Sequence, residues 1–412
     1  MKILIVVAYF VPEIASAAHV YFDLARAFVK KGHEVDIITS YPRKFNLNKN
    51  DADKEFSLEE MIDGIRVHRC KHLAKRDNMV MRGLEHFLLP GYYFKTYRQI
   101  GKKFDVCLIY IPPLPLYYFA KKIKRYDGTP SVLNYQDFHP QELTDVGVMK
   151  NKLMIKIMEH IEKKSYKNAE YITVLSKGGI DYVVKKGGNP NKIKHIYNGV
   201  LLSDFEKYQM KKEFKKKEGV ENKILISYSG ILSPFQGIDN ILDAAKKLSD
   251  YEDLIFYIVG DGMLKNHLEN RIRDEKIFNV KLLPLQPREE YFNIINSSDI
   301  STVSLDDRMK APCLPGKLIN LLALKQPIIA IVPYDSETAR VIQKAKCGVV
   351  VEPGNTEELE NTILKLKDNS EFRKELGENG KKFLEENMIL EKNVAVYEEI
   401  FNLLRNQKVK RR

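Results

Sequence analysis

The first half of the chain alternates short apolar segments with amphipathic segments, and this alternation limits the folds open to it. Residues 2–8 form a largely apolar run, which is typical of a parallel strand buried on both faces. A loop over 9–16 and a predicted helix over 17–31 follow, and Gly32 ends that helix before an apolar strand over 34–39. This strand–helix–strand order predicts a parallel, doubly wound α/β sheet.

The same pattern continues and then starts again in the second half. Further strands of the first half are expected over 106–110, 131–135 and 171–175. Strands of the second half are expected over 224–228, 254–259, 280–283, 300–304, 327–332 and 348–351, with a helix over 238–249. We therefore predict two doubly wound, Rossmann-like domains. Ligands of such sheets bind beyond the carboxyl ends of the strands, so a cleft between the domains is the expected site.

The second start of the pattern sets the expected domain boundaries. The polar, lysine-rich stretch 202–223 would link the domains. A helix over 390–405 would return to the first domain, and the basic tail 408–412 would be disordered. The predicted parts are an N-terminal Rossmann-like domain (1–201), a C-terminal Rossmann-like domain (202–387) and a C-terminal helix with its tail (388–412).

Cysteine and histidine usage argues against a disulfide or a metal site. The four cysteines are scattered and lack the paired spacing of a zinc or redox site, which favours a reducing, cytoplasmic setting. His68 and His72 are the nearest histidine pair, but they lie in strand-like sequence without a carboxylate partner. We expect no metal and no other cofactor, and neither a signal peptide nor a membrane-spanning helix.

The formal net charge of +12 lies entirely in residues 1–200. Such a domain suits an anionic partner: anionic lipid, a phosphorylated or polyanionic substrate, or nucleic acid. Segment 82–103 interleaves aromatic and basic residues and suits docking on an anionic membrane surface. The alternative is a core helix with a basic outer face. The helix expected over 149–166 has a basic face opposite an apolar face formed by Leu153, Ile157 and Ile161.

Segment 314–330 predicts a phosphate site in the second half. It is interpreted as a loop, a helix opened by Pro315, and an apolar strand. Lys317 then lies in the first helical turn, where a cation is unfavourable unless an anion docks on the free N–H groups. The alternative is a solvated surface lysine. The residues expected to bind phosphate here are Pro315, Gly316, Lys317 and Leu318.

Two glycine-containing loops follow predicted strands of the second half. Gly230 and Gly237 frame a loop before a helix, which suits the wrapping of a pyrophosphate. Segment 260–262 is, taken alone, only a turn. The residues of the first loop expected to contact a pyrophosphate are Gly230, Gln236 and Gly237.

Two further candidate segments follow strands of the first half. The loop after the first strand contains Pro12 and Glu13 and ends in the small residues Ser16 and Ala17 at a helix start, where an anion or a sugar could approach the backbone. A purely structural loop is the alternative. After the strand at 131–135, Asp137 and His139 could stabilise positive charge or position a nucleophile. The alternative is that Asp137 caps a local turn.

Together these segments resemble family 4 of the retaining glycosyltransferases, which have the GT-B fold. The resemblance spans nearly the whole chain and includes the segments 12–18, 31–35, 198–205, 230–237, 259–262 and 315–330. Within that family the chain is similar to bacterial N-acetyl-L-fucosaminyl transferases of surface-polysaccharide synthesis. Their Gly-plus-Gln-Gly, Pro-Ser-Lys and Asp-Leu-Trp-Pro elements correspond to Gly230 with 236–237, to 315–317 and to 137–140.

The resemblance implies a retaining transfer of a sugar, with an N-acetylated deoxy sugar as one candidate, from a UDP-linked donor to a lipid-linked or glycan acceptor. Lys317 and N–H groups near Gly230 and Gly316 would stabilise the leaving diphosphate without a metal. Gly260, Asp261 and Gly262 would contribute to nucleotide binding, and Asn320 would hydrogen-bond a ribose hydroxyl. Asp137 or His139 would face the sugar or the acceptor. The basic N-terminal domain would receive the acceptor at the inner face of the cell membrane, with no nucleic-acid partner.

Two departures from the family pattern bear on the donor site. Pro312 and Asn320 stand where the wider family has two glutamates eight positions apart. Leu232 and Gln236 stand where an arginine and a lysine often meet the diphosphate. Lys317, with Arg308 or Lys310 assisting, would then supply the positive charge.

Two rival functions are compatible with parts of the pattern. A nucleotide-sugar 2-epimerase has a similar two-domain fold, and a fold does not fix a reaction, but the segment 198–205 argues against it. A nucleic-acid binder could use the basic half, but no RNA- or DNA-recognition motif is present.

Overall fold

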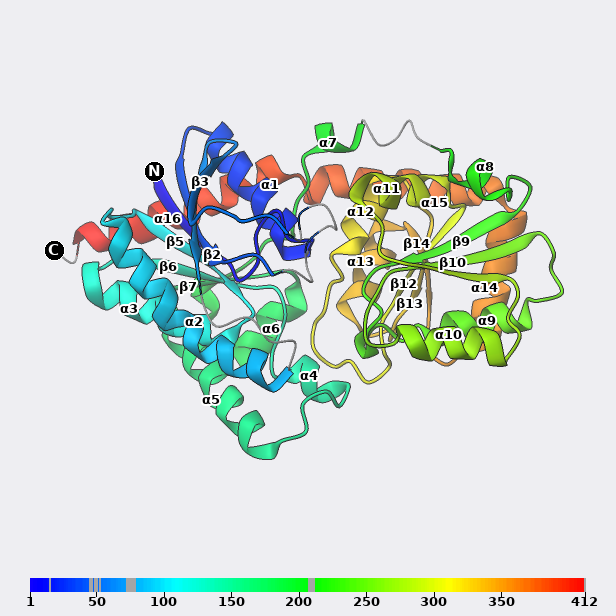
Figure 1. The fold of residues 1–412 in the computed structure, drawn as a ribbon, viewed down its shortest axis with the longest axis horizontal. Helices are drawn as coiled ribbons and strands as arrows, with labels where there is room; N and C mark the ends of the chain where they lie inside the picture. Colours follow the sequence, from blue (N-terminus) through cyan, green and yellow to red (C-terminus); the bar gives the residue numbers. More distant parts are fainter. Residues whose placement is uncertain are drawn as a thin grey trace. The chain divides into compact units, whose positions relative to one another are not determined.

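A computed structural model describes residues 1–14, 16–43, 47, 51, 53–71, 79–206 and 212–410. The chain forms two compact units, each built around one sheet (Figure 1). The first unit comprises the described residues of 1–144, 149–200 and 390–412, and the second those of 145–148 and 201–389. Both sheets are predominantly parallel with helices on both sides, so the prediction of two doubly wound α/β domains is confirmed.

The first unit contains an eight-stranded sheet in the order β3-β4-β2-β1-β5-β6-β7-β8. Among the described strands of this sheet, β3 and β4 form the one antiparallel pair. The apolar run at the N-terminus places β1 at the centre, where Ile5 pairs with Ile37 on one side and Leu108 on the other. The strands are β1 (Lys2–Val6), β2 (Glu34–Ser40), β3 (Glu59–Ile62), β4 (Ile65–Cys70), β5 (Val106–Ile111), β6 (Ser131–Tyr135), β7 (Tyr171–Val174) and β8 (Ile193–His195).

Helices cover both faces of this sheet (Figure 1). Helices α1 and α16 pack together on one face, and α2 and α3 on the other. The helices are α1 (Ser16–Lys30), α2 (Met79–Ile100), α3 (Tyr117–Asp127), α4 (Gln141–Asp145), α5 (Lys152–Asn168), α6 (Lys177–Lys185) and α16 (Leu390–Lys410).

The final helix belongs to the first unit through specific contacts. The ring centroids of Phe28 and Phe401 lie 5.7 Å apart, and His33 Nε2 lies 2.6 Å from a carboxylate oxygen of Glu398. Gly199 lies against the start of α16, because a Cβ there would meet the Cα of Leu390 at 2.9 Å. This contact explains why position 199, within the segment 198–205, needs a glycine.

The second unit contains a fully parallel, six-stranded sheet in the order β11-β10-β9-β12-β13-β14. Alternate residues of each strand face opposite sides. Ile226 and Phe256 join a core with α9, α10 and α14, while Leu225 and Ile255 join a core with α8 and α11. The strands are β9 (Ile224–Ser229), β10 (Leu254–Val259), β11 (Val280–Leu283), β12 (Ile300–Ser304), β13 (Ile328–Ile331) and β14 (Gly348–Val351).

Helices between successive strands, together with two before β9 and two after β14, form the layers around this sheet. They are α7 (Leu202–Glu206), α8 (Phe214–Glu218), α9 (Asp239–Lys247), α10 (Lys265–Asp274), α11 (Arg288–Ser297), α12 (Lys317–Ala323), α13 (Glu337–Ala345), α14 (Thr356–Asp368) and α15 (Ser370–Asn387).

Several sequence-based expectations about elements need correction. Strands β3 and β8 were not predicted, β4 was expected only as strand-like sequence around His68, and the expected link contains α7 and α8. His68 does have carboxylate partners, since its ring nitrogens lie 3.0 Å from Asp36 and 3.3 Å from Glu59. Helix α16 runs to Lys410, so residues 408–410 are helical, while 411–412 and His72 lie outside the described residues. Of the three residues of the apolar face expected on α5, Ile161 is buried, whereas Leu153 is 70% exposed and Ile157 is 40% exposed. Across the described ranges, no helix combines the length and hydropathy needed to span a membrane.

Candidate functional site

The strand orders place the candidate residues at the switch point of each sheet. In the second unit, β10 and β11 lie on one side of β9, and β12 lies on its other side, so the switch point is between β9 and β12. Loops after β9 and β12 therefore diverge and leave room at the carboxyl edge. In the first unit, β1 and β5 flank the equivalent point. The predicted segments after β1 and β6 lie at or beside it.

Lys317 lies at the start of α12 and is packed against β9. Its ammonium Nζ lies 3.8 Å from the ring centroid of Tyr228 and donates to Gln236 Oε1 at 2.9 Å. Burial lowers the pKa of Lys317 to about 7. Lys317 is therefore not the solvated surface lysine of the alternative interpretation.

Close approach of the backbone explains the glycines around this lysine. A Cβ on Gly230 would lie 2.7 Å from Lys317 Nζ, and a Cβ on Gly260 would lie 1.9 Å from the Gly230 carbonyl oxygen. The N–H groups of both glycines are already bonded, to Val259 O and Leu283 O. A glycine is therefore needed at position 230 because a side chain there would collide with Lys317. The Gly230 N–H is not the free anion donor that the sequence suggested.

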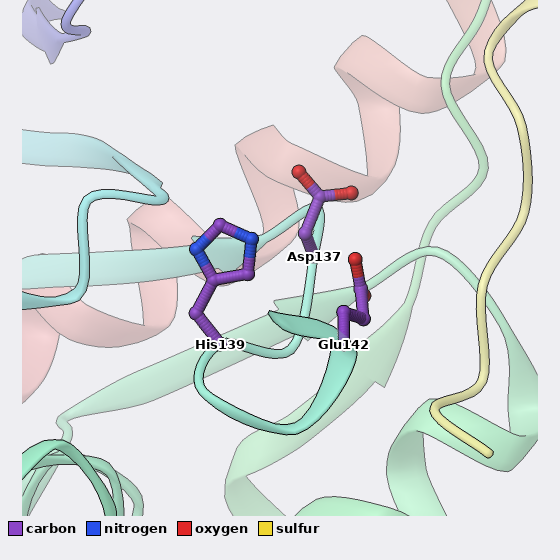
Figure 2. A group of neighbouring side chains, drawn as sticks. All are labelled: Asp137, His139 and Glu142. Carbon is purple, nitrogen blue, oxygen red and sulfur yellow. The ribbon is translucent and has the colours of Figure 1, made fainter. Parts of the chain in front are cut away.

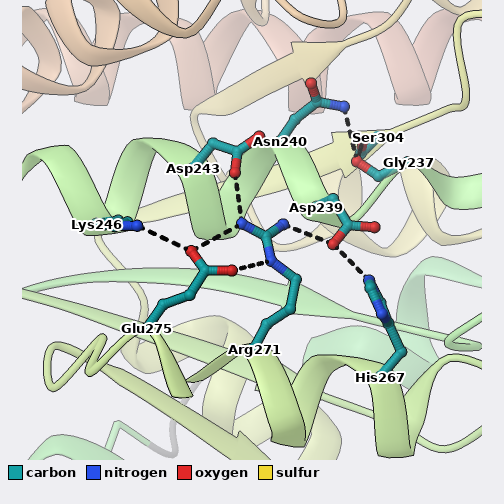
Figure 3. A network of polar contacts seen from close by, with 9 residues as sticks. All are labelled: Gly237, Asp239, Asn240, Asp243, Lys246, His267, Arg271, Glu275 and Ser304. Carbon is teal, nitrogen blue, oxygen red and sulfur yellow. Dashed lines mark hydrogen bonds and ion pairs between the residues drawn. The ribbon is translucent and has the colours of Figure 1, made fainter. Parts of the chain in front are cut away.

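The Gly237 turn is held by the side chains of Asn240 and Ser304 (Figure 3). The Gly237 carbonyl accepts from Asn240 Nδ2 at 2.9 Å and from Ser304 Oγ at 3.1 Å. Asn240 Oδ1 in turn accepts from the Gly354 N–H at 2.8 Å. Asn240 thus joins the loop before α9 to the loop after β14.

Arg271 fixes the first turns of α9 from the neighbouring helix α10 (Figure 3). Its guanidinium bonds to Asp239 and to Asp243, each at 2.7 Å. Glu275 also binds Arg271 at 2.7 Å, and His267 Nε2 lies 2.8 Å from Asp239. This network, which sequence reasoning missed, orients the helix that follows the Gly237 turn.

The remaining predicted residues of the 314–320 segment have mixed roles. Gly316 caps α12, which begins at Lys317, so Pro315 precedes the helix and does not open it. The Pro315 carbonyl accepts from the Leu318 N–H, and the Leu318 side chain is fully buried in the core. Asn320 Nδ2 donates to the hydroxyl of Tyr291 at 3.2 Å.

Near this segment the charged side chains of Asp261 and Arg308 are engaged in local contacts, and Lys310 is held through its backbone N–H. Asp261 Oδ1 accepts from the Gly262 N–H at 2.8 Å, so Asp261 closes its own turn. Arg308 pairs with Asp306 at 2.6 Å, and the Lys310 N–H donates to Asp145 at 2.8 Å. Lys317 is thus the predicted cation that lies beside Gly230 and Gln236.

In the first unit, Asp137, His139 and Glu142 form a cluster after β6 (Figure 2). One ligand-type atom of each lies within 4.8 Å of the others. Burial raises the pKa of Asp137 to about 6, while burial and the nearby His86 lower the pKa of His139 to about 4. At neutral pH the cluster therefore holds a neutral imidazole beside a largely ionised Asp137.

The cap of this turn is Glu142, which sequence reasoning did not include among the site residues. Its Oε1 accepts from the Phe138 N–H at 2.7 Å, a role that the alternative interpretation had given to Asp137. Spacing was the available signal, since Glu142 lies three residues after His139. Imidazole and carboxylates are also ligands for divalent cations, so the absence of a metal from the mechanism stays a prediction.

The loop after β1 is anchored by a buried carboxylate. Glu13 is fully buried, and its Oε1 accepts from the Arg43 N–H at 3.3 Å. The Arg43 guanidinium lies over the ring of Tyr9, 4.6 Å from the centroid, and pairs with Glu85 at 2.7 Å. Glu13 therefore supports the loop from inside.

The other predicted residues of this loop lie around the start of α1. Pro12 and Ala17 are partly buried. Ser16 opens α1, and its side chain lies outside the described part of the structure.

A polar network behind the Asp137 turn was not predicted. Asn134 accepts from the hydroxyl of Tyr21 at 2.6 Å and donates to the hydroxyl of Tyr397 at 2.9 Å. Gln136 and Asn198 exchange two hydrogen bonds through their amides, at 3.0 and 2.7 Å. The network links β6, α1 and α16, and so fixes the strand that carries Asp137 and His139.

The aromatic residues predicted to dock on a membrane from α2 are largely internal. Tyr93 and Tyr97 are buried in the core, and Lys102 pairs with Glu34 and Asp36. Lys95 and Arg98 remain exposed. For Tyr93, Tyr97 and Lys102 the core-helix alternative is correct.

Comparisons with known proteins agree with this architecture. Residues 17–199 match the family model described as "Glycosyl transferase 4-like domain", and residues 209–383 match "Glycosyl transferases group 1". The putative colanic acid biosynthesis glycosyl transferase WcaI of Escherichia coli is 23% identical over 370 residues, which span 87% of this chain and 90% of the relative.

Two further similar proteins extend the comparison. The uncharacterized glycosyltransferase MJ1069 of Methanocaldococcus jannaschii is 29% identical over 62% of this chain and 64% of its own length. The crystal structure of Anabaena HepE in complex with UDP and glucose superposes with a TM-score of 0.72 at 14% identity, covering 98% of this chain and 99% of the other. The likeness to HepE shows the GT-B fold.

These comparisons do not confirm the specific similarity to N-acetyl-L-fucosaminyl transferases, and they give no support to the epimerase alternative. The chain carries a 4-like domain followed by a group 1 domain, and it is a glycosyltransferase of the group 1 type with the GT-B fold.

Proposed function

We propose that the protein transfers a sugar from a UDP-linked donor to a lipid-linked or glycan acceptor in cell-surface polysaccharide synthesis, with retention at the anomeric carbon. The observation that carries the proposal is the ammonium of Lys317, held beside Gly230 and 2.9 Å from Gln236 at the switch point of the second sheet. The name of WcaI supports polysaccharide synthesis, and the UDP complex of HepE supports a UDP-linked donor.

The donor half of the reaction breaks the bond between the anomeric carbon and the diphosphate oxygen. Negative charge then grows on the leaving diphosphate, and Lys317 stabilises it. Because burial lowers the pKa of free Lys317 to about 7, an arriving diphosphate raises that pKa and favours the protonated form. Lys317 is thus most fully protonated when the diphosphate is bound and negative charge grows on it.

The acceptor half of the reaction uses the Asp137 cluster. Asp137, with its pKa raised to about 6, is mostly ionised at neutral pH and takes the proton of the acceptor hydroxyl or stabilises positive charge on the sugar ring. His139 is neutral at that pH and accepts or donates a hydrogen bond to the same hydroxyl. Gly237 and Asn320 contribute to nucleotide binding, and the Pro12–Ala17 loop contributes to sugar or acceptor binding.

We further propose that the reaction requires no metal, since Lys317 supplies the positive charge at the leaving group. The acceptor is presented at the inner face of the cell membrane, and the enzyme works in the cytoplasm or as a peripheral membrane protein. An N-acetylated deoxy sugar is our candidate for the transferred group.

Release of UDP tests this function directly. Purified protein is incubated with a panel of UDP-sugars, a membrane lipid extract as acceptor source, and EDTA. UDP release that needs both the extract and one UDP-sugar, and that persists in EDTA, is the expected result. Product formed from a UDP-sugar without any acceptor would contradict transfer, and loss of activity in EDTA that a divalent cation restores would contradict the metal-free mechanism.

A further inference from the structure

Helix α5 carries an exposed apolar patch on its first two turns. Leu153 is 70% exposed, Met154 38% and Ile157 40%. Leu153 and Met154 lie four and three positions before Ile157, so the three side chains lie on neighbouring parts of one helical surface. Exposed apolar residues that gather in this way mark an interaction site more often than isolated ones do.

The helix is well formed where the patch begins. Asn151 caps it, with Oδ1 accepting from the N–H groups of Leu153 and Met154, each at 3.0 Å. Farther along, Ile161 and Glu162 are buried against the body of the unit, and Glu162 pairs with Lys186 at 2.8 Å. Figure 1 shows α5 at the outer edge of its unit. The patch is therefore displayed on a rigid, anchored helix.

Lysines surround the patch on the solvent side. At 100° per residue, the lysines at 152, 156, 163, 164 and 167 fall on the exposed side of the helix, next to Leu153 and Ile157. All five are exposed, as is Lys150 just before the helix, and none forms an ion pair among the described residues. Glu159 is the one exposed carboxylate along 152–168. The surface therefore combines apolar side chains with uncompensated positive charge.

We propose that the first half of α5 is a membrane-docking surface that binds an anionic lipid bilayer. Leu153, Met154 and Ile157 enter the boundary between headgroups and acyl chains, while the lysines bind the headgroups. A nucleic acid would match the charge but would leave the aliphatic patch in water. The charge and the apolar surface together favour the bilayer. The surface differs from α2, where the sequence had placed membrane docking.

Sedimentation with lipid vesicles tests the proposal on the full-length protein. The vesicles are phosphatidylcholine and phosphatidylglycerol in equal parts, with phosphatidylcholine alone for comparison. Wild type should bind the anionic vesicles, less so at high salt, and should bind the neutral vesicles weakly. Each lysine near an anionic surface contributes about fivefold to binding, so K152E/K156E should weaken it at least about twentyfold.

Two further variants separate the apolar contribution from net charge. L153Q/M154Q/I157Q keeps every charge and should also lose most vesicle binding, because the aliphatic patch no longer inserts. K121E/K122E on α3 makes the same charge change as K152E/K156E at two exposed lysines of the same unit and should bind nearly as wild type. Since the mutated side chains are exposed, circular dichroism and melting temperature should stay unchanged.

The outcomes distinguish this inference from the proposed function. Failure of wild type to bind anionic vesicles, or equal binding by wild type and both α5 variants, would overturn it. Salt-sensitive binding to a random oligonucleotide that K152E/K156E removes and L153Q/M154Q/I157Q keeps, with no vesicle binding, would replace the bilayer with nucleic acid. Stabilisation by UDP, measured on the same preparations, reports on the donor site independently.

Discussion

The ammonium of Lys317 lies 3.8 Å from the ring centroid of Tyr228, and this contact links the start of α12 to the end of β9. A cation over an aromatic face is stabilised by the ring quadrupole, but burial still lowers the pKa of this lysine to about 7. The protein therefore holds a cation whose charge depends on whether an anion is present.

Proton uptake should accompany UDP binding above pH 7. In the free protein Lys317 loses its proton as the pH rises through about 7, and the bound diphosphate restores it. We expect calorimetry in buffers of different ionisation enthalpy to show uptake approaching one proton near pH 8. Lys317→Met, which keeps the length of the stem, should abolish that uptake. Equal uptake in wild type and variant would assign it to another group.

Asp137→Asn should reduce transfer by about 10²- to 10⁴-fold, the usual contribution of a positioned acid–base group. UDP should stabilise the variant as well as wild type, since Asp137 lies in the other unit. In wild type, activity should fall as the pH drops through about 6, because the carboxylate becomes protonated. Steady-state rates measured across pH 5–8 check this. If Asp137→Asn shows the same fall in rate near pH 6 as wild type, Asp137 is not the group that causes it.

Gly230→Ala should weaken donor binding at least about tenfold. The new Cβ would lie 2.7 Å from Lys317 Nζ, so the ammonium would have to leave its place beside Gln236. Gly91→Ala on α2 is the matched control, because a Cβ there meets nothing within 4 Å and alanine favours a helix. Titration with UDP compares the two. Unchanged affinity in Gly230→Ala would show that the position of Lys317 does not matter.

Asn240→Ala should lower the free energy of unfolding by about 1–3 kcal/mol, because the Gly354 N–H and the Gly237 carbonyl each lose a partner. If the Gly237 turn binds nucleotide, KM for the donor should rise more than kcat falls. Asp243→Ala removes one contact of Arg271 at the surface and should cost about 1 kcal/mol or less. Urea unfolding and donor kinetics give both quantities. A stability loss with unchanged KM would limit Asn240 to a structural role.

The strands could be predicted largely because they are buried on both faces. Apolar runs such as 254–259 need no long-range information, and β10 occupies those residues. β3 and β8 were missed because they lie at the two sheet edges, and the described edge residues Glu59 and Lys194 are polar and exposed. Edge strands lack the continuous apolar run that identified the others.

The geometry of the candidate site depends on contacts that a local pattern cannot show. Lys317 was singled out from its place at a helix start, but its low pKa depends on burial by the folded unit, and its contact with Tyr228 joins residues far apart in the sequence. The Asn134 network joins residues from β6, α1 and α16. Periodicity likewise indicated an apolar face on α5. It could not show that Leu153 and Ile157, in the first two turns, are exposed while Ile161 is buried.

Thermal stabilisation by nucleoside diphosphates tests the central claim most directly, because specific binding to the native state raises its melting temperature by mass action. The protein and its Lys317→Met variant are heated with UDP, ADP or GDP, and Lys344→Met, at an exposed position of α13, serves as the matched lysine control. We predict a rise with UDP in wild type and in Lys344→Met, and its loss in Lys317→Met. No rise with any nucleotide, or an equal rise in Lys317→Met, would contradict the donor site proposed here.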